Sequence, residues 1–327
     1  MPTRGDTAAG TTAAAPERGA GTRRGHAATW SELSKARLSG LVILTAAAGY
    51  AVAPGEPEGW WLRLLWTSLG TALAAASAAM LNQLAEVRRD ARMQRTAGRP
   101  LPAGRARPRT VFAVGIAMGY AGWAVLAAGT TLAAATLAAA NILLYVLLYT
   151  PLKPRTTLNT LVGAVTGAVP PVIGWTAATG RMDPGAWALF ALLFTWQLPH
   201  FLALAWLYRE DYAAGGFAML PSRDPQGTAT AQACLLSSLA LVPVGLLGTL
   251  VGIAGLGYAA VAAVAGLWMS WLALGFLRER TDARARRLFL ASLAYLPLVL
   301  GAMVIDRGGL APRPDAVQVI VEEEAKP

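Results

Sequence analysis

The sequence predicts an all-α integral membrane protein: a bundle of about nine transmembrane helices around a central cavity, with a cytoplasmic N-terminus. Three observations predict this class. Of the 327 residues, 55% are hydrophobic and 14% are charged, whereas soluble domains carry roughly 25% charged residues. The apolar residues form long uninterrupted stretches, and the basic residues concentrate between alternate stretches.

Each of the apolar stretches is close to the roughly 20 residues that a helix needs to cross a bilayer. Their Ala and Gly content allows helix backbones to approach one another closely in lipid. They form one membrane domain, residues 29–306, between an N-terminal tail, 1–28, predicted to be disordered because it lacks apolar periodicity, and a polar C-terminal tail, 307–327. We expect the helices at residues 38–55, 64–87, 108–128, 132–150, 157–178, 185–206, 228–252, 256–277 and 286–305.

Two smaller features accompany these stretches. Residues 30–37 (WSELSKAR) are predicted to form a short interfacial helix with Ser31 as its N-cap. The tandem Pro170-Pro171 lies inside an apolar stretch and is expected to kink that helix, with freed backbone groups lining a cavity. The single cysteine, Cys234, excludes an intrachain disulfide and is expected to be a small buried hydrophobe.

The net charge of +10 follows the positive-inside pattern. With a cytoplasmic N-terminus, 23 of the 28 Lys and Arg residues fall in segments on the inner side. The basic excess therefore sets the topology, and it argues against nucleic acid as a partner. The same topology places the polar loops 82–109, 149–159 and 207–227 on one face of the membrane.

The first of these loops carries Asn82, Glu86 and Asp90 at positions i, i+4 and i+8. On a helix this spacing keeps the three side chains on one face. Their hard oxygen ligands suit Mg²⁺, and the following Arg95 and Arg99 suit phosphate oxygens. The alternative is a solvated helix end with surface ion pairs to neighbouring arginines, and the spacing alone favours neither.

Acidic residues also end the apolar stretch at 185–206. Glu210 and Asp211 follow it and are predicted to form a second set of metal ligands facing the first. The alternative is an aromatic belt at the bilayer surface, because Trp and Tyr are enriched there. Two acidic clusters on the same membrane face are not expected to arise by chance among surface residues. They therefore favour a site that binds a metal and a diphosphate.

The third polar loop contributes Lys153 and Arg155. Both are candidates for phosphate contacts, and positive-inside anchoring accounts for them equally well. Asn159, at the start of the next helix, is a candidate to cap that helix or to line the cavity. His200 lies in an apolar stretch, where it is either a substrate contact or a hydrogen-bonded buried imidazole packed by aromatic rings.

The motif at 82–102 resembles the first signature of the intramembrane UbiA-type prenyltransferases, whose usual form is N-x-x-x-D-x-x-x-D. Glu86 stands in for the middle Asp and keeps the carboxylate. The segments 149–156, 163–180 and 196–220 resemble the branch of this family that farnesylates protohaem IX (the haem O synthases). The resemblance runs from about Lys35 to Leu300. The second motif departs from the wider family pattern, because Tyr208 and Tyr212 occupy its usual Asp positions, so it stays open which carboxylate reaches the metal.

The resemblance implies farnesyl diphosphate and haem B as substrates, haem O and diphosphate as products, Mg²⁺ as cofactor, and the inner (cytoplasmic) membrane of the cell as location. It leaves open a haem A synthase as partner enzyme. The alternatives are prenylation of a quinone precursor or another aromatic acceptor, and a non-enzymatic haem-handling assembly factor or transporter.

We assign the site residues on this basis. The expected metal ligands are Asn82, Glu86, Asp90 and Asp211. Glu210 joins them as a catalytic carboxylate, and Tyr149 and Tyr208 are expected to stabilise the allylic cation through their π faces. The expected substrate contacts are Arg95, Arg99, Lys153, Arg209, Asn159 and His200.

Overall fold

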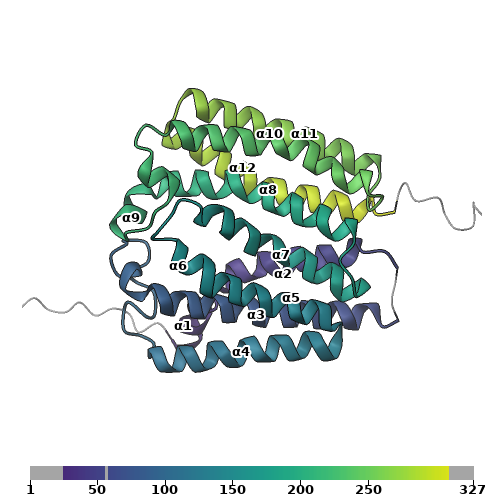
Figure 1. Ribbon diagram of the computed structural model, residues 1–327, viewed down its shortest axis with the longest axis horizontal. Coiled ribbons are helices and arrows are strands. Elements are labelled where there is room, and N and C mark those ends of the chain that lie inside the picture. Colours follow the sequence, from purple (N-terminus) through teal and green to yellow (C-terminus); the bar gives the residue numbers. More distant parts are fainter. Residues whose placement is uncertain (1–24, 56–57, 309–327) are drawn as a thin grey trace, which may run out of the picture.

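The computed structural model describes residues 25–55 and 58–308, and over these ranges the chain is built almost entirely of helices (Figure 1). Eight of the described helices are long and apolar enough to cross a membrane, and Leu38–Val52 forms a shorter apolar helix. The predicted all-α membrane fold is therefore confirmed. The predicted tails lie mostly outside the described residues.

The nine predicted stretches all appear as helical segments, with no bound displaced by more than four residues. The membrane-length helices lie side by side, and sequence neighbours run in opposite directions (Figure 1). The bounds are α1 His26–Leu33, α2 Ala36–Val52, α3 Trp60–Asp90, α4 Pro108–Gly129, α5 Leu132–Leu143, η1 Leu144–Tyr149, α6 Thr150–Leu152, α7 Asn159–Thr179, α8 Pro184–Leu207, α9 Arg209–Ala214, η2 Leu220–Arg223, α10 Thr228–Leu250, α11 Leu256–Arg278 and α12 Asp282–Ile305.

The prediction for the segment before the first membrane helix was wrong in its bounds. Helix α1 begins at His26, inside the segment expected to be disordered, and Ser31 lies within the helix while Gly25 occupies the N-cap position. The chain then breaks at Lys35, which adopts a left-handed backbone conformation with φ 49° and ψ 46°. Helix α2 starts at the next residue.

Helix α7 runs through Pro170 and Pro171 to Thr179 as one element. A methyl group built on Gly49 of α2 would collide with the backbone of Pro171, and one on Gly174 would collide with the backbone of α2. The proline segment therefore packs directly against α2, and these two glycines permit the close approach.

The fourth membrane-length segment contains a π-helix that the sequence pattern did not predict. Residues Leu144–Tyr149 are π-helical between α5 and α6. Pro151 has no N–H to continue the α-helical ladder, and the Thr150 hydroxyl donates to the carbonyl of Tyr145, five residues back, at 2.8 Å. Single π-helical turns of this kind frequently occur at functional sites.

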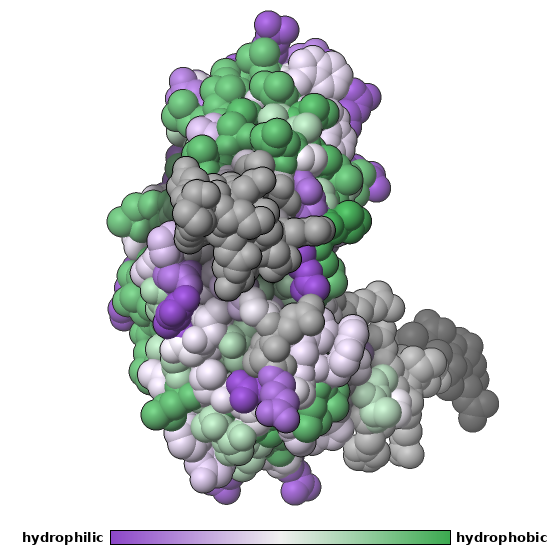
Figure 2. Space-filling model, turned by 90° about the vertical axis from the view of Figure 1, so that its right-hand side faces the viewer, coloured by the Kyte–Doolittle hydropathy of each residue, from purple (hydrophilic) through white to green (hydrophobic). Residues whose placement is uncertain are grey.

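The polar loops gather at one end of the bundle, as predicted. This end carries α9 and lies at the left of Figure 1. The backbone N–H of Ala218 donates to the carbonyl of Lys153 at 2.7 Å, and that of Gln94 donates to the Asp211 carboxylate at 2.7 Å, so the three loops are joined by hydrogen bonds. At the opposite end, in Figure 2, hydrophilic residues are scattered among apolar ones.

Candidate active site

A cavity of about 220 Å³ lies where the three polar loops meet. Side chains from the α1–α2 junction, α3, η1, α7, α8 and the loops that follow them line it. The lining combines charged groups near α3 with aromatic rings from η1 and α8. It includes Lys35, Asn82, Glu86, Asp90, Arg95, Thr96, Arg99, Tyr145, Tyr149, Lys153, Phe201, Tyr212 and Phe217.

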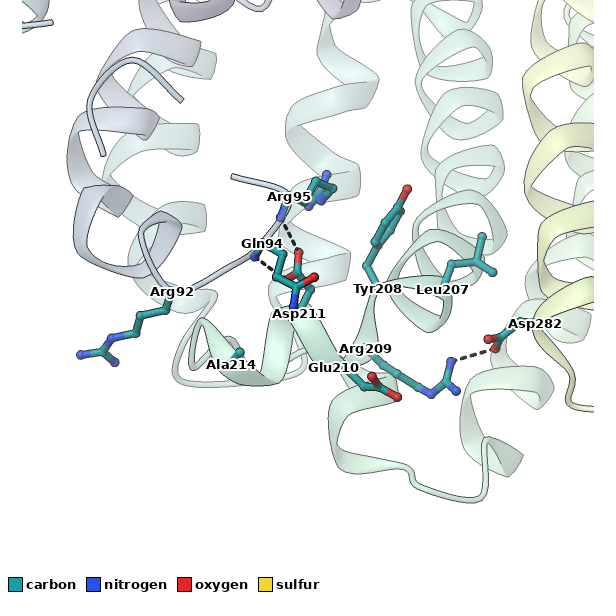
Figure 3. Close-up of a pocket in the computed structure, with 10 residues that line it drawn as sticks. All are labelled: Arg92, Gln94, Arg95, Leu207, Tyr208, Arg209, Glu210, Asp211, Ala214 and Asp282. Atoms are coloured by element: carbon teal, nitrogen blue, oxygen red, sulfur yellow. Dashed lines mark hydrogen bonds and ion pairs between the residues drawn. The ribbon is translucent and has the colours of Figure 1, made fainter. Parts of the chain in front are cut away.

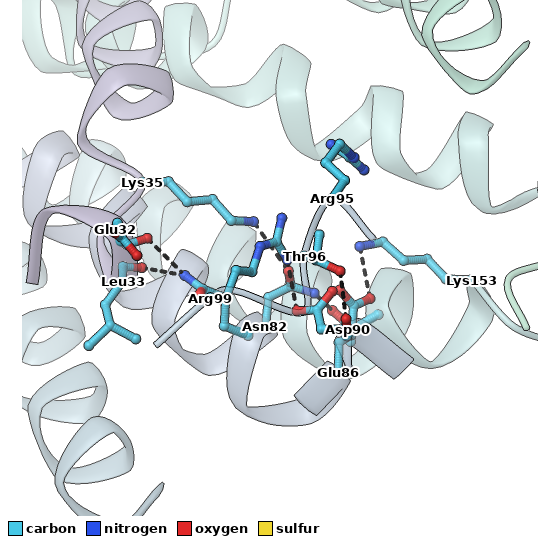
Figure 4. A network of polar contacts seen from close by, with 12 residues as sticks. Glu32, Leu33, Lys35, Asn82, Glu86, Asp90, Arg95, Thr96, Arg99 and Lys153 are labelled. Atoms are coloured by element: carbon cyan, nitrogen blue, oxygen red, sulfur yellow. Dashed lines mark hydrogen bonds and ion pairs between the residues drawn. The ribbon is translucent and has the colours of Figure 1, made fainter. Parts of the chain in front are cut away.

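Helix α3 presents Asn82, Glu86 and Asp90 to this cavity on one face, as their spacing predicts (Figure 4). With 31 residues, α3 is about 46 Å long, whereas a bilayer core is about 30 Å thick. The three side chains are nonetheless buried, at 0%, 4% and 2% exposure. A solvated helix end is therefore excluded, because such residues would be exposed to water.

The two carboxylates pair with cations from other parts of the site (Figure 4). Lys153 Nζ lies 2.8 Å from Glu86 Oε1, and Arg99 Nη1 lies 2.7 Å from Asp90 Oδ2. The arginines next to them on α3 are not their partners. The polar face of α3 therefore belongs to an enclosed network, in which each of the two buried carboxylates meets an opposite charge.

Asn82 is held between two neighbours. Its Nδ2 donates to the hydroxyl of Thr150 at 3.0 Å, and its Oδ1 accepts from Lys35 Nζ at 3.4 Å. The amide orientation is thereby fixed, with its oxygen facing the cation side of the cavity. This oxygen and the two carboxylates provide three hard donor groups in one row.

Cations outnumber carboxylates in the lining. Lys35, Arg95, Arg99 and Lys153 face two carboxylates, which leaves a formal charge of +2. Burial lowers the pKa of Lys35. Burial also acts to lower the pKa of Lys153, but the Tyr149 hydroxyl and the Glu86 carboxylate facing it outweigh this effect and hold that pKa above its usual value. The cavity is thus suited to a multiply charged anion.

Lys35 is a site residue that sequence reasoning missed. It is the one non-glycine residue with positive φ among the described residues, a conformation that costs about 1–2 kcal/mol. Gln83, a residue of α3, donates from Nε2 to the carbonyl of Leu33 at 2.7 Å. This hydrogen bond holds the turn between α1 and α2 in place. The available signal was a lysine directly before the first apolar stretch, but that pattern also fits an interfacial anchor.

The second acidic motif is placed differently from the prediction. Both oxygens of Asp211 accept hydrogen bonds from the backbone of the first loop, from Gln94 N at 2.7 Å and Arg95 N at 3.2 Å (Figure 3). Glu210 points away from Asp211 (Figure 3). Both line a neighbouring pocket of about 710 Å³ and do not line the cavity beside α3. The expected second set of ligands facing the first is therefore not formed here.

Arg95 lies between the two pockets and lines both. Its guanidinium is 4.8 Å from the ring centre of Tyr208 and 5.5 Å from that of Tyr212, and Nη2 donates to the Tyr212 hydroxyl at 3.2 Å. Tyr208 thus contacts Arg95 outside the cavity, and Tyr149 lines the cavity with its ring centre 4.6 Å from Lys153 Nζ.

Arg209, expected to contact diphosphate, lies outside this cavity. Its Nη1 donates to Asp282 at 2.8 Å and to the carbonyl of Trp206 at 2.8 Å. Arg209 therefore joins the end of α8 to the start of α12 at the edge of the larger pocket.

Asn159 and His200 also have structural partners. The Asn159 side chain is fully buried, and its Nδ2 donates to the carbonyls of Thr156 at 2.6 Å and Ala218 at 2.9 Å. His200 Nδ1 lies 2.8 Å from Ser292 Oγ, between α8 and α12. His200 is only partly buried, but its contact with Ser292 and the Trp196 ring centre 5.1 Å from its own agree with the alternative of a hydrogen-bonded imidazole packed by aromatic rings.

The loop at 215–219 closes the cavity beside α3. Arg89 Nη1 donates to the carbonyls of Gly215 at 3.2 Å and Gly216 at 2.9 Å. Gly216 has φ +70°, and a methyl group built there would lie 2.9 Å from the same Nη1. The backbone conformation therefore favours glycine at 216, and a side chain there would also have to displace the Arg89 guanidinium.

The row of donors on α3 fits Mg²⁺. The described residues contain no group of three or more His, Cys, Asp or Glu side chains placed to hold a metal alone. Mg²⁺, however, is commonly held by one or two carboxylates together with water and substrate phosphates. Glu86, Asp90 and the oxygen of Asn82 meet this requirement in a cation-rich cavity.

Comparison with known proteins agrees with this architecture. The sequence pattern of the UbiA prenyltransferase family matches residues 42–296. A protoheme IX farnesyltransferase of Solibacter usitatus is 42% identical and covers 85% of this chain and 98% of its own length. One of Opitutus terrae is 45% identical, covering 84% and 93%. The mitochondrial protoheme IX farnesyltransferase of Homo sapiens is 40% identical, covering 84% of this chain and 61% of its own length.

Solved structures share the fold at low sequence identity. A UbiA homolog from Archaeoglobus fulgidus bound to DMAPP and Mg²⁺ superposes with a TM-score of 0.63 at 14% identity, covering 85% of this chain and 99% of its own. The apo UbiA homolog from Aeropyrum pernix K1 gives a TM-score of 0.62 at 19% identity, covering 85% and 97%. On both sequence and fold, this chain belongs to the UbiA prenyltransferase family.

Proposed function

We propose that this chain transfers the farnesyl group of farnesyl diphosphate to a vinyl group of haem B, giving haem O and diphosphate. The observation that carries the proposal is the cavity beside α3, in which four cations surround two carboxylates and an amide oxygen. The choice of haem as acceptor is supported by relatives 40–46% identical that are named protoheme IX farnesyltransferases.

The diphosphate binds to the cations of the cavity. Lys153 and Arg99 pair with Glu86 and Asp90 in the present structure, and both cations line the space that a diphosphate enters. Phosphate oxygens compete with the carboxylates for these donors. Arg95 and Lys35 add two further charges, so the leaving group's charge is balanced in a site of low dielectric constant.

Glu86, Asp90 and Asn82 are the residues that would hold Mg²⁺. When bound, Mg²⁺ neutralises charge on the departing diphosphate. The UbiA homolog from Archaeoglobus fulgidus bound to DMAPP and Mg²⁺ supports the use of this metal. In place of the expected metal contact, Asp211 positions Arg95 by holding its backbone.

The aromatic side chains protect the reactive farnesyl group. The C1–O bond breaks, and its electron pair leaves with the diphosphate. Tyr145 and Tyr149 offer ring faces to the resulting allylic cation, and Phe201 and Phe217 keep water from it. One vinyl carbon of haem B then bonds to C1, and the other vinyl carbon takes up a hydroxyl group from water, which releases a proton.

The topology is part of the same proposal. Residues 29–306 form the catalytic membrane domain, and the polar end that holds the cavity faces the cytoplasm, because most basic residues lie there. The protein resides in the inner membrane of the cell, and its product passes to a haem A synthase.

A membrane assay tests the proposal. Purified protein in detergent or nanodiscs receives haem B, farnesyl diphosphate and MgCl₂, and mass spectrometry of the extracted haem reports haem O. We expect haem O with Mg²⁺, none after chelation with EDTA, and recovery when Mg²⁺ is restored. Arg181→Ala is the control, because Arg181 is exposed at the far end of the bundle.

Two results would contradict the proposal. Prenylation of a quinone precursor such as 4-hydroxybenzoate without any haem O would identify a different acceptor. Haem O formation that continues after complete chelation would show that the reaction does not require the proposed Mg²⁺.

A further inference from the structure

A second basic cavity lies at the turn between α11 and α12. Its volume is about 270 Å³, and it shares no lining residue with the candidate active site. Figure 1 places this turn at the same polar end of the bundle as α9. Its lining is Trp271, Leu272, Leu274, Gly275, Arg278, Glu279, Arg284 and Arg287.

The lining changes from apolar to basic along α11. Trp271, Leu274, Gly275 and Arg278 stand at i, i+3, i+4 and i+7, which is one face of a helix. Trp271 is 66% exposed, about 10 Å along the helix from Arg278. An exposed Trp on a membrane helix is typical of the bilayer interface, so the apolar half of the cavity faces lipid.

The basic half of the cavity carries unbalanced charge. Glu279 holds Arg284 through two contacts, Nη2 to Oε1 at 2.7 Å and Nε to Oε2 at 3.1 Å. Over residues 25–55 and 58–308, neither Arg278 nor Arg287 donates a side-chain hydrogen bond or forms an ion pair. Two guanidinium groups therefore remain available to an anion at this cavity.

Gly275 leaves space between the two halves. A methyl group built there would meet the Arg284 side chain at 3.7 Å, an ordinary contact distance, and no backbone atom. The absence of a side chain at 275 thus contributes to the volume of the cavity, and a methyl group fits there without displacing the backbone.

We propose that this cavity binds an anionic phospholipid of the bilayer, with the phosphate between Arg278 and Arg287 and an acyl chain against Trp271 and Leu274. Charge complementarity and position carry the assignment. Basic pockets between membrane helices at the headgroup level bind anionic headgroups. A water-soluble anion would use the arginines without the exposed indole and leucine.

The test compares two double variants with the same change in charge. Arg278→Gln with Arg287→Gln removes the two cations of the cavity. Arg280→Gln with Arg286→Gln removes two arginines of the same turn that do not line it. Wild-type protein and both variants are delipidated in detergent and titrated with phosphatidylglycerol or phosphatidylcholine. Native mass spectrometry counts bound lipid, and thermal unfolding reports stabilisation.

We expect saturable binding of phosphatidylglycerol by the wild type and by the 280/286 variant, and about tenfold weaker binding or more by the 278/287 variant. Gly275→Leu, which changes no charge, should weaken binding by filling the cavity. Inorganic phosphate at millimolar concentration should neither stabilise the protein nor displace the lipid.

Equal losses in the two double variants would overturn the proposal, because binding would then follow net charge and not the cavity. Equal binding of phosphatidylcholine would overturn the role of the arginines. Displacement by inorganic phosphate would identify a soluble anion as the ligand, and a co-purifying polypeptide released by the 278/287 variant would identify a protein partner.

Discussion

Lys153 Nζ lies 2.8 Å from Glu86 Oε1, with the two side chains only 14% and 5% exposed. The pair joins the loop after α6 to the polar face of α3. Removing one member of a buried ion pair leaves the other charge uncompensated. Under the proposed function, the diphosphate would take over the Lys153 cation, and the Glu86 carboxylate would then be free to hold a metal ion.

The same Glu→Gln substitution in each acidic motif tests which of the two motifs binds the metal. Glu86→Gln keeps the size of the side chain and removes its charge, so we expect farnesyl transfer to fall by about 100-fold or more, with a weaker apparent affinity for Mg²⁺. Glu210→Gln changes an exposed side chain in the neighbouring pocket and should stay within about threefold of wild type. Haem O formation over a Mg²⁺ titration measures both, and the reverse ranking would reject the placement of the metal beside α3.

Asp211→Asn tests whether this residue positions Arg95 or binds metal. Asparagine keeps one oxygen for the two N–H donors at 94 and 95, so the loop should loosen. We expect a several-fold higher KM for farnesyl diphosphate, a smaller change in kcat and an unchanged dependence on Mg²⁺. A large loss of apparent Mg²⁺ affinity would instead make Asp211 a metal ligand.

Lys35 combines a strained backbone with a charge in the cavity. Lys35→Gly relieves a cost of about 1–2 kcal/mol and removes the cation, so the thermal unfolding temperature should not fall while farnesyl transfer drops by about tenfold or more. Lys35→Ala should lose the same activity and retain the strain, which makes it the matched control for stability. Wild-type kinetics in both variants would show that Lys35 has a role only in the turn between α1 and α2 and none in farnesyl transfer.

Asn159→Ala is expected to act on stability. The side chain donates to two loop carbonyls at 2.6 and 2.9 Å, and leaving such buried groups without a partner costs about 1–3 kcal/mol. We expect a lower unfolding temperature in detergent, and near-normal KM values for both substrates in the protein that remains folded. A rise in the KM of one substrate, without a loss of stability, would show that Asn159 contacts that substrate.

The site could be predicted from the sequence where its geometry is local. Asn82, Glu86 and Asp90 lie on one helix, so their common face follows from helical periodicity. Lys153 was identified as a cation near the membrane surface, but its pairing with Glu86 depends on how η1 and α6 pack against α3. The hydrogen bonds of Asp211 to the backbone of the first loop could not be predicted, because its partners lie 116 and 117 residues earlier in the chain.

The sequence by itself determined the membrane helices, their order, and the gathering of the polar loops at one end, because apolar length and the placement of basic residues act over short stretches of chain. Only the tertiary structure decided which charges meet. It turned Lys35 into the cavity through a left-handed turn held by Gln83, and it assigned Asp211 to the loop that carries Arg95. These outcomes depend on packing between distant segments, where a buried polar group stabilises the fold only once a partner from elsewhere satisfies it.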